Sequence, residues 1–178
     1  MGTAGEPVPD CRPEVMIVRD EVDELVEAWD RERPDLATTP MHIWSRIKRL
    51  EQHLDASRRQ AYAEHGIDVH EFDVLAALRR AGEPYRLSPG QLTQANHVTS
   101  GTMTHRLDRL VSRGFVERGT NPDDGRAVRV SLTETGREIV DAALSSLLAA
   151  EEALLASLPA DRRERLADDL RALMMLQG

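Results

Sequence analysis

Arg126 follows a run of turn-forming residues, Asn121-Pro122-Asp123-Asp124-Gly125, that separates two segments rich in strand-forming side chains. An arginine at the tip of a β-hairpin can enter the minor groove of duplex DNA, where the negative potential favours a guanidinium. Asp124 can hold that guanidinium by a bidentate pair. These residue types and their spacing predict DNA recognition by Arg126, with Asp124 orienting it. A simple solvated turn is the alternative.

A helix that reads DNA bases is predicted from Thr99, its expected N-cap, to about residue 113. At 100° per residue, one inward face collects its apolar side chains, which are Met103, Leu107, Leu110 and Val111. Thr102, His105 and Arg109 point the opposite way. Gly101 has no side chain to read with, and we expect it to permit close approach of the backbone to the groove.

The polar residues of this helix divide into two expected roles. Ser100, Thr102 and His105 are predicted to approach base edges, where short hydrogen-bonding side chains can distinguish sequences. Arg109 and Arg113 are predicted to contact phosphates, which position a protein on the duplex. For the two arginines, an ordinary solvated helix face is the alternative.

A second group of residues predicts a small-molecule switch. Asp73 lies beside the apolar stripe of residues 69–80, and Arg106 lies about 80° from the centre of its own helix's inward face. An Asp73–Arg106 pair would tie the core to the DNA-reading helix, and an anionic ligand could compete for Arg106. Trp29 offers an apolar wall and an indole N–H. The alternatives are simple packing for Trp29 and a local arginine, Arg79 or Arg80, as the partner of Asp73.

The elements that position these residues can be predicted from helix and turn signals. Ser88, Pro89 and Gln91 form a capping box with proline at the first helical position, which predicts a helix over residues 89–96. A turn at 97–99 leads to the reading helix, and Gly114 ends it. Residues 115–118 and 128–132 are predicted strands, and residues 85–87 could add a short third strand.

The remaining chain is predicted to be helical. Apolar residues at three- and four-residue spacing predict helices over residues 14–32, 40–64, 69–80, 134–157 and from 159 onward. We expect four parts: a disordered tail (1–13), an extra N-terminal helix (14–39), dimerisation helices (40–66 and 134–178) and a DNA-binding region (67–133).

In the order in which these motifs occur, the chain resembles the MarR family of transcription regulators. The resemblance rests on residues 87–92, 104–110, 114–118, 123–127 and 132–137, and covers roughly residues 40 to 176. It implies a mainly α-helical fold with a small antiparallel β-wing, a winged helix-turn-helix flanked by dimerisation helices. Many relatives have a further arginine where this chain has Gly125, so the resemblance implies the loss of one auxiliary phosphate contact.

The resemblance extends to a subgroup of this family that responds to urate and related anions. The extra N-terminal helix with Trp29, and the residues Asp73 and Arg106, carry it. It implies that these three residues bind a small anionic metabolite, such as a purine or an organic acid, and that the ligand releases the DNA. The sequence therefore predicts a repressor, although an activator remains the alternative.

Broad apolar faces on the terminal helices predict a homodimer. Apolar positions cover well over half the circumference of residues 139–158, more than a small winged domain can bury alone. Members of the family form twofold dimers through such helices. A twofold dimer places its reading helices roughly 34–36 Å apart, so the operator is expected to be a pseudo-palindrome in double-stranded DNA.

The charge distribution is compatible with DNA binding despite a net charge of −8. Residues 99–130 hold six basic and four acidic side chains, whereas residues 1–35 hold four basic and eleven acidic ones. A local basic patch matters more than the overall balance. No apolar run approaches the ~20 residues that span a bilayer. A single cysteine fits a reducing cytoplasm, and we expect neither a membrane partner nor a cofactor.

Other functions are less favoured by the sequence. Redox sensing at Cys11 and metal sensing by the six histidines are alternatives, but Cys11 sits beside an acidic residue and the histidines form no tight cluster. No phosphate loop, nucleophile elbow or HExxH motif predicts an enzyme. A dimeric helical interaction module without DNA binding would not explain Arg126.

Overall fold

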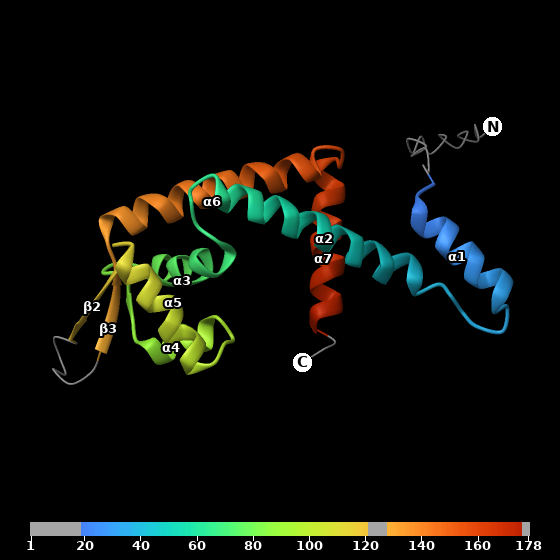
Figure 1. Ribbon diagram of the computed structural model, residues 1–178. Helices are drawn as coiled ribbons and strands as arrows, with labels where there is room; N and C mark the ends of the chain where they lie inside the picture. The colour runs from blue at the N-terminus through green and yellow to red at the C-terminus, as the bar shows by residue number, and fades with distance from the viewer. Residues whose placement is uncertain (1–18, 121–127, 176–178) are drawn as a thin grey trace, which may run out of the picture. The chain divides into compact units, whose positions relative to one another are not determined.

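The computed structural model describes residues 19–120 and 128–175, which form seven helices and one three-stranded sheet (Figure 1). The chain divides into two compact units, residues 1–51 and 52–178. One long helix, α2 (Met41–Ala63), contributes to both. The predicted fold, mainly helical with a small antiparallel sheet, is confirmed.

The first unit contains α1 (Glu21–Glu32) and the N-terminal half of α2. Val22 and Val26 are its buried apolar residues. The helix was expected from residue 14, but α1 begins at Glu21. The reason is local: Asp20 adopts an extended backbone conformation and accepts hydrogen bonds from the free amides of Val22 and Asp23. Residues 14–18 lie outside the described residues.

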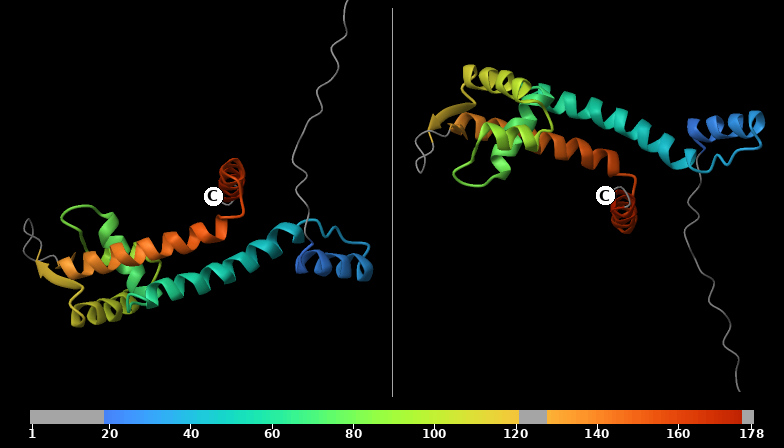
Figure 2. Two further views of the ribbon diagram at one scale, coloured as in Figure 1. Left: turned by 90° about the horizontal axis from the view of Figure 1, so that it is seen from above. Right: turned by 90° about the horizontal axis from the view of Figure 1, so that it is seen from below.

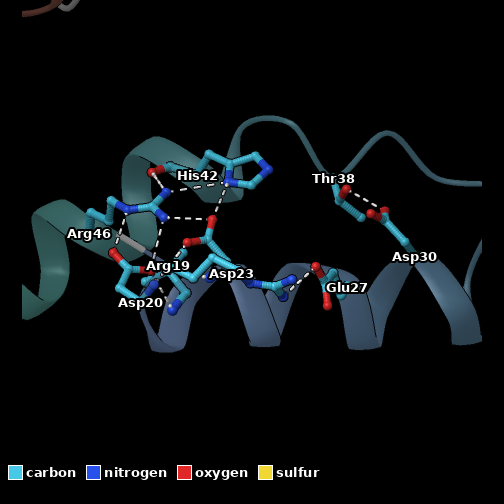
Figure 3. Close-up of polar contacts among 9 residues, drawn as sticks. Arg19, Asp20, Asp23, Glu27, Asp30, Thr38, His42 and Arg46 are labelled. Carbon is cyan, nitrogen blue, oxygen red and sulfur yellow. Dashed lines mark hydrogen bonds and ion pairs between the residues drawn. The ribbon is translucent and has the colours of Figure 1, made fainter. Parts of the chain in front are cut away.

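A cluster of charged side chains joins α1 to α2 within this unit (Figure 3). Arg46 donates from Nε and Nη2 to Asp20, at 2.8 and 2.9 Å, and from Nη2 to Asp23 at 2.8 Å. The hydrogen bond from Arg46 lowers the pKa of Asp20 to about 2. The pKa of Asp23 is also lowered, mainly by the hydrogen bond from the Asp20 amide and next by the one from Arg46. The carboxylates therefore stay ionised and hold the two helices together well below neutral pH.

The core of the second unit lies where three helices meet the sheet at one end of α6 (Figures 1 and 2). These helices are α3 (Val69–Arg80), α4 (Pro89–Ala95) and α5 (Ser100–Ser112), and α6 spans Glu134–Leu155. The rings of Tyr62 and Phe72 stack with their centroids 4.2 Å apart. Fully buried side chains fill the centre: Val74, Leu75, Leu78, Leu92, Met103, Leu107, Leu110, Val130 and Val140.

The sheet consists of β1 (Arg86–Leu87), β2 (Val116–Thr120) and β3 (Val128–Leu132), in the antiparallel order β1-β3-β2. The short third strand that the sequence suggested is therefore present and pairs with β3, placing Arg86 opposite Ser131. The strand expected at residues 115–118 starts one residue later and continues to Thr120, opposite Val128. Beyond this pair the tip, residues 121–127, lies outside the described part.

The last two helices, α6 and α7 (Ala160–Met175), leave much apolar surface uncovered. Val140, Ala143 and Leu147 of α6 are buried, whereas no residue of α7 is. The exposed apolar side chains of the two helices are Leu144, Leu148, Leu154, Leu155, Leu166, Leu170, Met174 and Met175. This single chain thus leaves a broad apolar face on both helices.

Candidate DNA-binding surface

Capping interactions fix both helices of the helix-turn-helix. The Ser88 side chain accepts from the Gln91 amide at 3.2 Å, and the Gln91 side chain accepts from the Ser88 amide at 2.8 Å. This is the predicted capping box, with Pro89 at the start of α4. Thr99 caps α5 by accepting from the Thr102 amide at 3.3 Å, as predicted. Between them, His97 takes a left-handed conformation with φ 51°.

The helical phase of α5 is largely confirmed. Met103, Leu107 and Leu110 are buried, and Thr102 and His105 face solvent. Val111, which was also predicted to face inward, is 38% exposed. That prediction was wrong because Val111 lies 100° further round the helix than the fully buried Leu110, at the edge of the buried face.

The N-terminal turn of α5 exposes short polar side chains and one glycine. Ser100, Gly101 and Thr102 are exposed, and the hydroxyls of Thr99 and Thr102 lie 2.9 Å apart. A Cβ atom added at Gly101 would meet no atom within 4 Å. The fold itself therefore does not require glycine here, and close approach of the Gly101 backbone to the DNA groove stays a prediction.

Arg109 and Arg113, the predicted phosphate contacts, both reach acidic residues at the start of α3. Arg109 Nη1 donates to Asp68 Oδ2 at 2.9 Å, and its Nε lies 3.1 Å from Glu71 Oε1. Arg113 Nη1 donates to both oxygens of Glu71 at 2.7 Å. Arg113 also stacks on the ring of Phe115, 4.5 Å from its centroid. Phosphate contacts by these arginines remain predictions, and the structure gives them internal partners as well.

Asp68 and Glu71 are residues of this surface that the sequence reasoning missed. They form the capping box of α3, a signal that was available in the sequence but predicts only a helix start. Their positions, 41 and 42 residues before the arginines, give no sign that the start of α3 meets the end of α5. Only the folded chain brings them together.

The sheet is tied to both helices by arginines. Arg118 of β2 lies 2.7 Å from Asp108 of α5, and Arg129 of β3 donates to the Gln91 side chain at 3.1 Å. The strands that carry the predicted wing are thus fixed against the reading helix. Asp124 and Arg126, the predicted wing-tip residues, lie outside the described residues, and their roles stay predictions.

The predicted Asp73–Arg106 pair is not formed as a hydrogen bond among the described contacts. Instead, Arg106 Nη2 lies 3.0 Å from Nδ1 of His70, which precedes Asp73 by one turn of α3. Burial raises the pKa of Asp73, and the charge of Arg106 is the largest influence that opposes the rise. Among the described contacts, Arg106 therefore reaches α3 through His70 and not through Asp73.

Two open pockets meet at His70. One, about 540 Å³, is lined by Arg58, Arg59, Tyr62, Asp73 and their neighbours on α2, α3 and α6. The other, about 440 Å³, lies over α5 and the start of α3. Its lining residues are Asp68, His70, Glu71, Thr102, His105, Arg106 and Arg109. His70 is thus shared between the pocket over α5 and a pocket that holds two arginines and two aspartates, Asp55 and Asp73.

Trp29, the third residue predicted to bind a ligand, belongs to α1 of the first unit, where it is 46% exposed. Asp73 and Arg106 belong to the second unit. The grouping of all three into one site therefore stays a prediction.

Comparison with known proteins identifies the chain. A family model described as MarR family matches residues 65–127, which contain α3 to β2. Over 121 residues the chain is 36% identical to the HTH-type transcriptional regulator PecS of Dickeya dadantii, a match that spans 68% of this chain and 73% of PecS. The chain belongs to the MarR family.

Further relatives support this MarR-family assignment. The multiple antibiotic resistance protein MarR of Escherichia coli is 40% identical over 75 residues, which are 42% of this chain and half of that protein. A crystal structure of a mutant MarR from E. coli complexed with operator DNA matches with a TM-score of 0.63 and 29% identity, covering 76% of this chain and 96% of that one. This MarR-family member is accordingly a DNA-binding transcription regulator and not an enzyme. Among the described residues, no helix is long and apolar enough to cross a membrane.

Proposed function

We propose that this protein is a homodimeric repressor that binds a pseudo-palindromic operator and leaves it when a small organic anion binds. The observation that carries the proposal is the surface of α5. Its first turn is exposed and free of large side chains, and Thr102 and His105 face outward beside it. Short polar side chains on such a helix suit base edges in the major groove.

The apolar faces of α6 and α7 support the dimer. Eight exposed leucines and methionines on two adjacent helices form a surface that association of a second copy would cover. Sedimentation of the full chain should therefore give twice the mass of one chain. Leu148→Arg, which places a charge on this face, should shift the equilibrium toward monomers and weaken operator binding with it.

The pocket beside Asp73 supports a switch of the kind that releases DNA. Arg58 and Arg59 place positive charge in a pocket that also holds the carboxylates of Asp55 and Asp73. Tyr62 supplies an aromatic wall, and His70 connects the pocket to Arg106 on α5. An anion that binds better when Arg106 has moved would shift the reading helix.

Binding experiments with the full chain test both parts. Thr102→Ala and His105→Ala should weaken binding to the promoter DNA next to the gene while leaving binding to random duplex nearly unchanged. Arg126→Ala should weaken binding to every sequence and flatten its salt dependence. Equal losses on both DNAs for Thr102→Ala would contradict base reading by α5.

The ligand is sought by thermal shift with purine, aromatic and tricarboxylic anions. Any anion that stabilises the protein should then release promoter DNA from the wild type but not from Arg106→Ala. Undiminished release from Arg106→Ala would overturn the switch. If the protein binds DNA and no anion releases it, we would infer a cytoplasmic regulator that acts without a ligand, or one that responds to oxidation or metal.

A further inference from the structure

The guanidinium of Arg109, on the DNA-facing side of α5, is already bound to two carboxylates of its own chain. Its Nη1 donates to Asp68 Oδ2 at 2.9 Å, and its Nε lies 3.1 Å from Glu71 Oε1. A phosphate that contacts Arg109 therefore meets a guanidinium whose positive charge is already shared with these two carboxylates. The two carboxylates differ in how readily they can give way.

Glu71 is fixed in place. Its side chain is 3% exposed, and it accepts two hydrogen bonds from Arg113 and one from the Asp68 amide. A buried carboxylate with this many partners is costly to release, because an uncompensated charge would remain inside the protein. Glu71 is therefore part of the fold and keeps its contact with Arg109 Nε.

Asp68 is different because its pair with Arg109 is exposed. The two side chains are 42% and 53% exposed, and pairs of this kind contribute little in water and exchange readily. The two oxygens of Asp68 also have separate tasks. Oδ1 accepts from the Glu71 amide and caps α3, whereas Oδ2 binds Arg109. The charge of Asp68 is thus separable from its role as a helix cap.

Asp68 also lines the same pocket as the residues that are proposed to read bases. It lines the 440 Å³ pocket together with Thr102, His105 and Arg109. A carboxylate here both occupies Arg109 and repels phosphate from its neighbourhood. Every duplex that docks on α5 meets this charge, whatever its sequence.

We propose that Asp68 acts as an intramolecular competitor of DNA phosphate for Arg109 and so limits the affinity of the protein for duplex DNA. DNA binding then includes an exchange, in which Arg109 Nη1 leaves Asp68 for a phosphate oxygen while Nε stays on Glu71. The inference rests on the proposed function, because it requires α5 to be the DNA-reading helix.

Asp68→Asn tests the proposal, because asparagine caps helices as well as aspartate does but carries no charge. Binding to random duplex should tighten about fivefold near physiological salt, the scale of an exposed ion pair. From about 50 to 200 mM KCl, the slope of log affinity against log salt should steepen by about 0.9 for each additional phosphate that the protein neutralises. Asp68→Ser, a second good N-cap without charge, should tighten binding equally if the asparagine variant folds poorly.

Two further variants separate this effect from a change in total charge. Glu83→Gln removes one negative charge from an exposed loop between α3 and β1 and should leave affinity and slope within error. In an Arg109→Gln background, Asp68→Asn should lose most of its effect on affinity. Three results would overturn the competitor role. Glu83→Gln could raise DNA affinity as much as Asp68→Asn does, or Asp68→Asn could fail to raise it at all. Asp68→Asn could also raise affinity fully in the Arg109→Gln background.

The wild type keeps this test apart from the test of the proposed function. If wild-type protein binds duplex and Thr102→Ala weakens its promoter binding, α5 reads DNA, and a null result for Asp68→Asn then rejects the competitor alone. If the wild type binds neither promoter nor random duplex, the proposed function itself fails, and the competitor role fails with it.

Discussion

The carbonyl oxygen of Phe115 lies 2.0 Å from the position that a Cβ atom on Gly136 would occupy. The same oxygen accepts hydrogen bonds from the amide and hydroxyl of Thr133, the N-cap of α6, at 3.1 and 3.0 Å. The Thr133 hydroxyl in turn accepts from the Gly136 amide at 3.0 Å. The start of α6 is therefore packed directly on the backbone that follows the reading helix.

Gly136→Ala should lower the free energy of unfolding by at least about 2 kcal/mol. Overpacking of a filled site costs about 1–3 kcal/mol, and here the clash is with backbone, which cannot rotate away. The better helix propensity of alanine offsets only about 1 kcal/mol. Urea denaturation followed by circular dichroism measures the change. An unchanged midpoint would mean that α6 does not pack on Phe115 this closely.

Gly101→Ala should behave in the opposite way. No atom lies within 4 Å of an added Cβ, and Gly101 is in the first turn of α5 with an ordinary backbone. We therefore expect stability to hold or rise by up to about 1 kcal/mol from helix propensity. DNA affinity should fall about tenfold, or about 1.4 kcal/mol, because the methyl group holds the helix away from the groove. A variant that is more stable and binds DNA equally well would contradict a close approach at Gly101.

Local signals in the sequence predicted the elements of the DNA-binding region well. The capping boxes and helix phase depend on residues three or four apart, which is the range that a helix itself sets. Ser88, Thr99 and the buried face of α5 were predictable for this reason. Gly136 was visible as part of a motif, but its contact with the Phe115 carbonyl required the fold.

Partners distant in sequence could not be predicted in the same way. Arg106 was expected to meet Asp73 because the helical phase of both residues allowed it, yet His70, one turn away on α3, lies within hydrogen-bond distance instead. Helical phase shows on which face of a helix a side chain lies, to within about one turn along the helix. A hydrogen bond, in contrast, requires a specific atom within about 3 Å. The acidic partners of Arg109 and Arg113 were missed for the same reason.

Glu71→Gln should lower the free energy of unfolding by about 2 kcal/mol, since hydrogen bonds to charged groups contribute about 1.5–3 kcal/mol. Glutamine preserves the capping box of α3, so the loss reports the contacts with Arg113 and Arg109. Asp68→Asn is the matched control, because its ion pair is exposed and its cap is retained; it should change stability by less than about 1 kcal/mol. Equal urea midpoints for both variants would argue against a buried anchor at Glu71.

The attachment of α1 should depend on pH through Asp20. Its pKa is lowered to about 2, with the hydrogen bond from Arg46 as the largest cause. A carboxylate whose pKa is lower in the folded state contributes stability that is complete above its ordinary pKa of 3.8 and is lost as pH falls toward about 2. Amides of α1 should therefore lose protection from hydrogen exchange within this pH window.

Arg46→Gln separates this contact from general acid unfolding. The variant should raise the pKa of Asp20, measured by NMR titration of its carboxyl carbon, toward the ordinary value, while the amides of Val22 and Asp23 still hold it somewhat lower. Near pH 5, α1 amides should exchange faster than in the wild type, and amides of α3, in the other unit, should not. An Asp20 pKa that stays near 2 without Arg46 would show that the helix cap alone accounts for the shift.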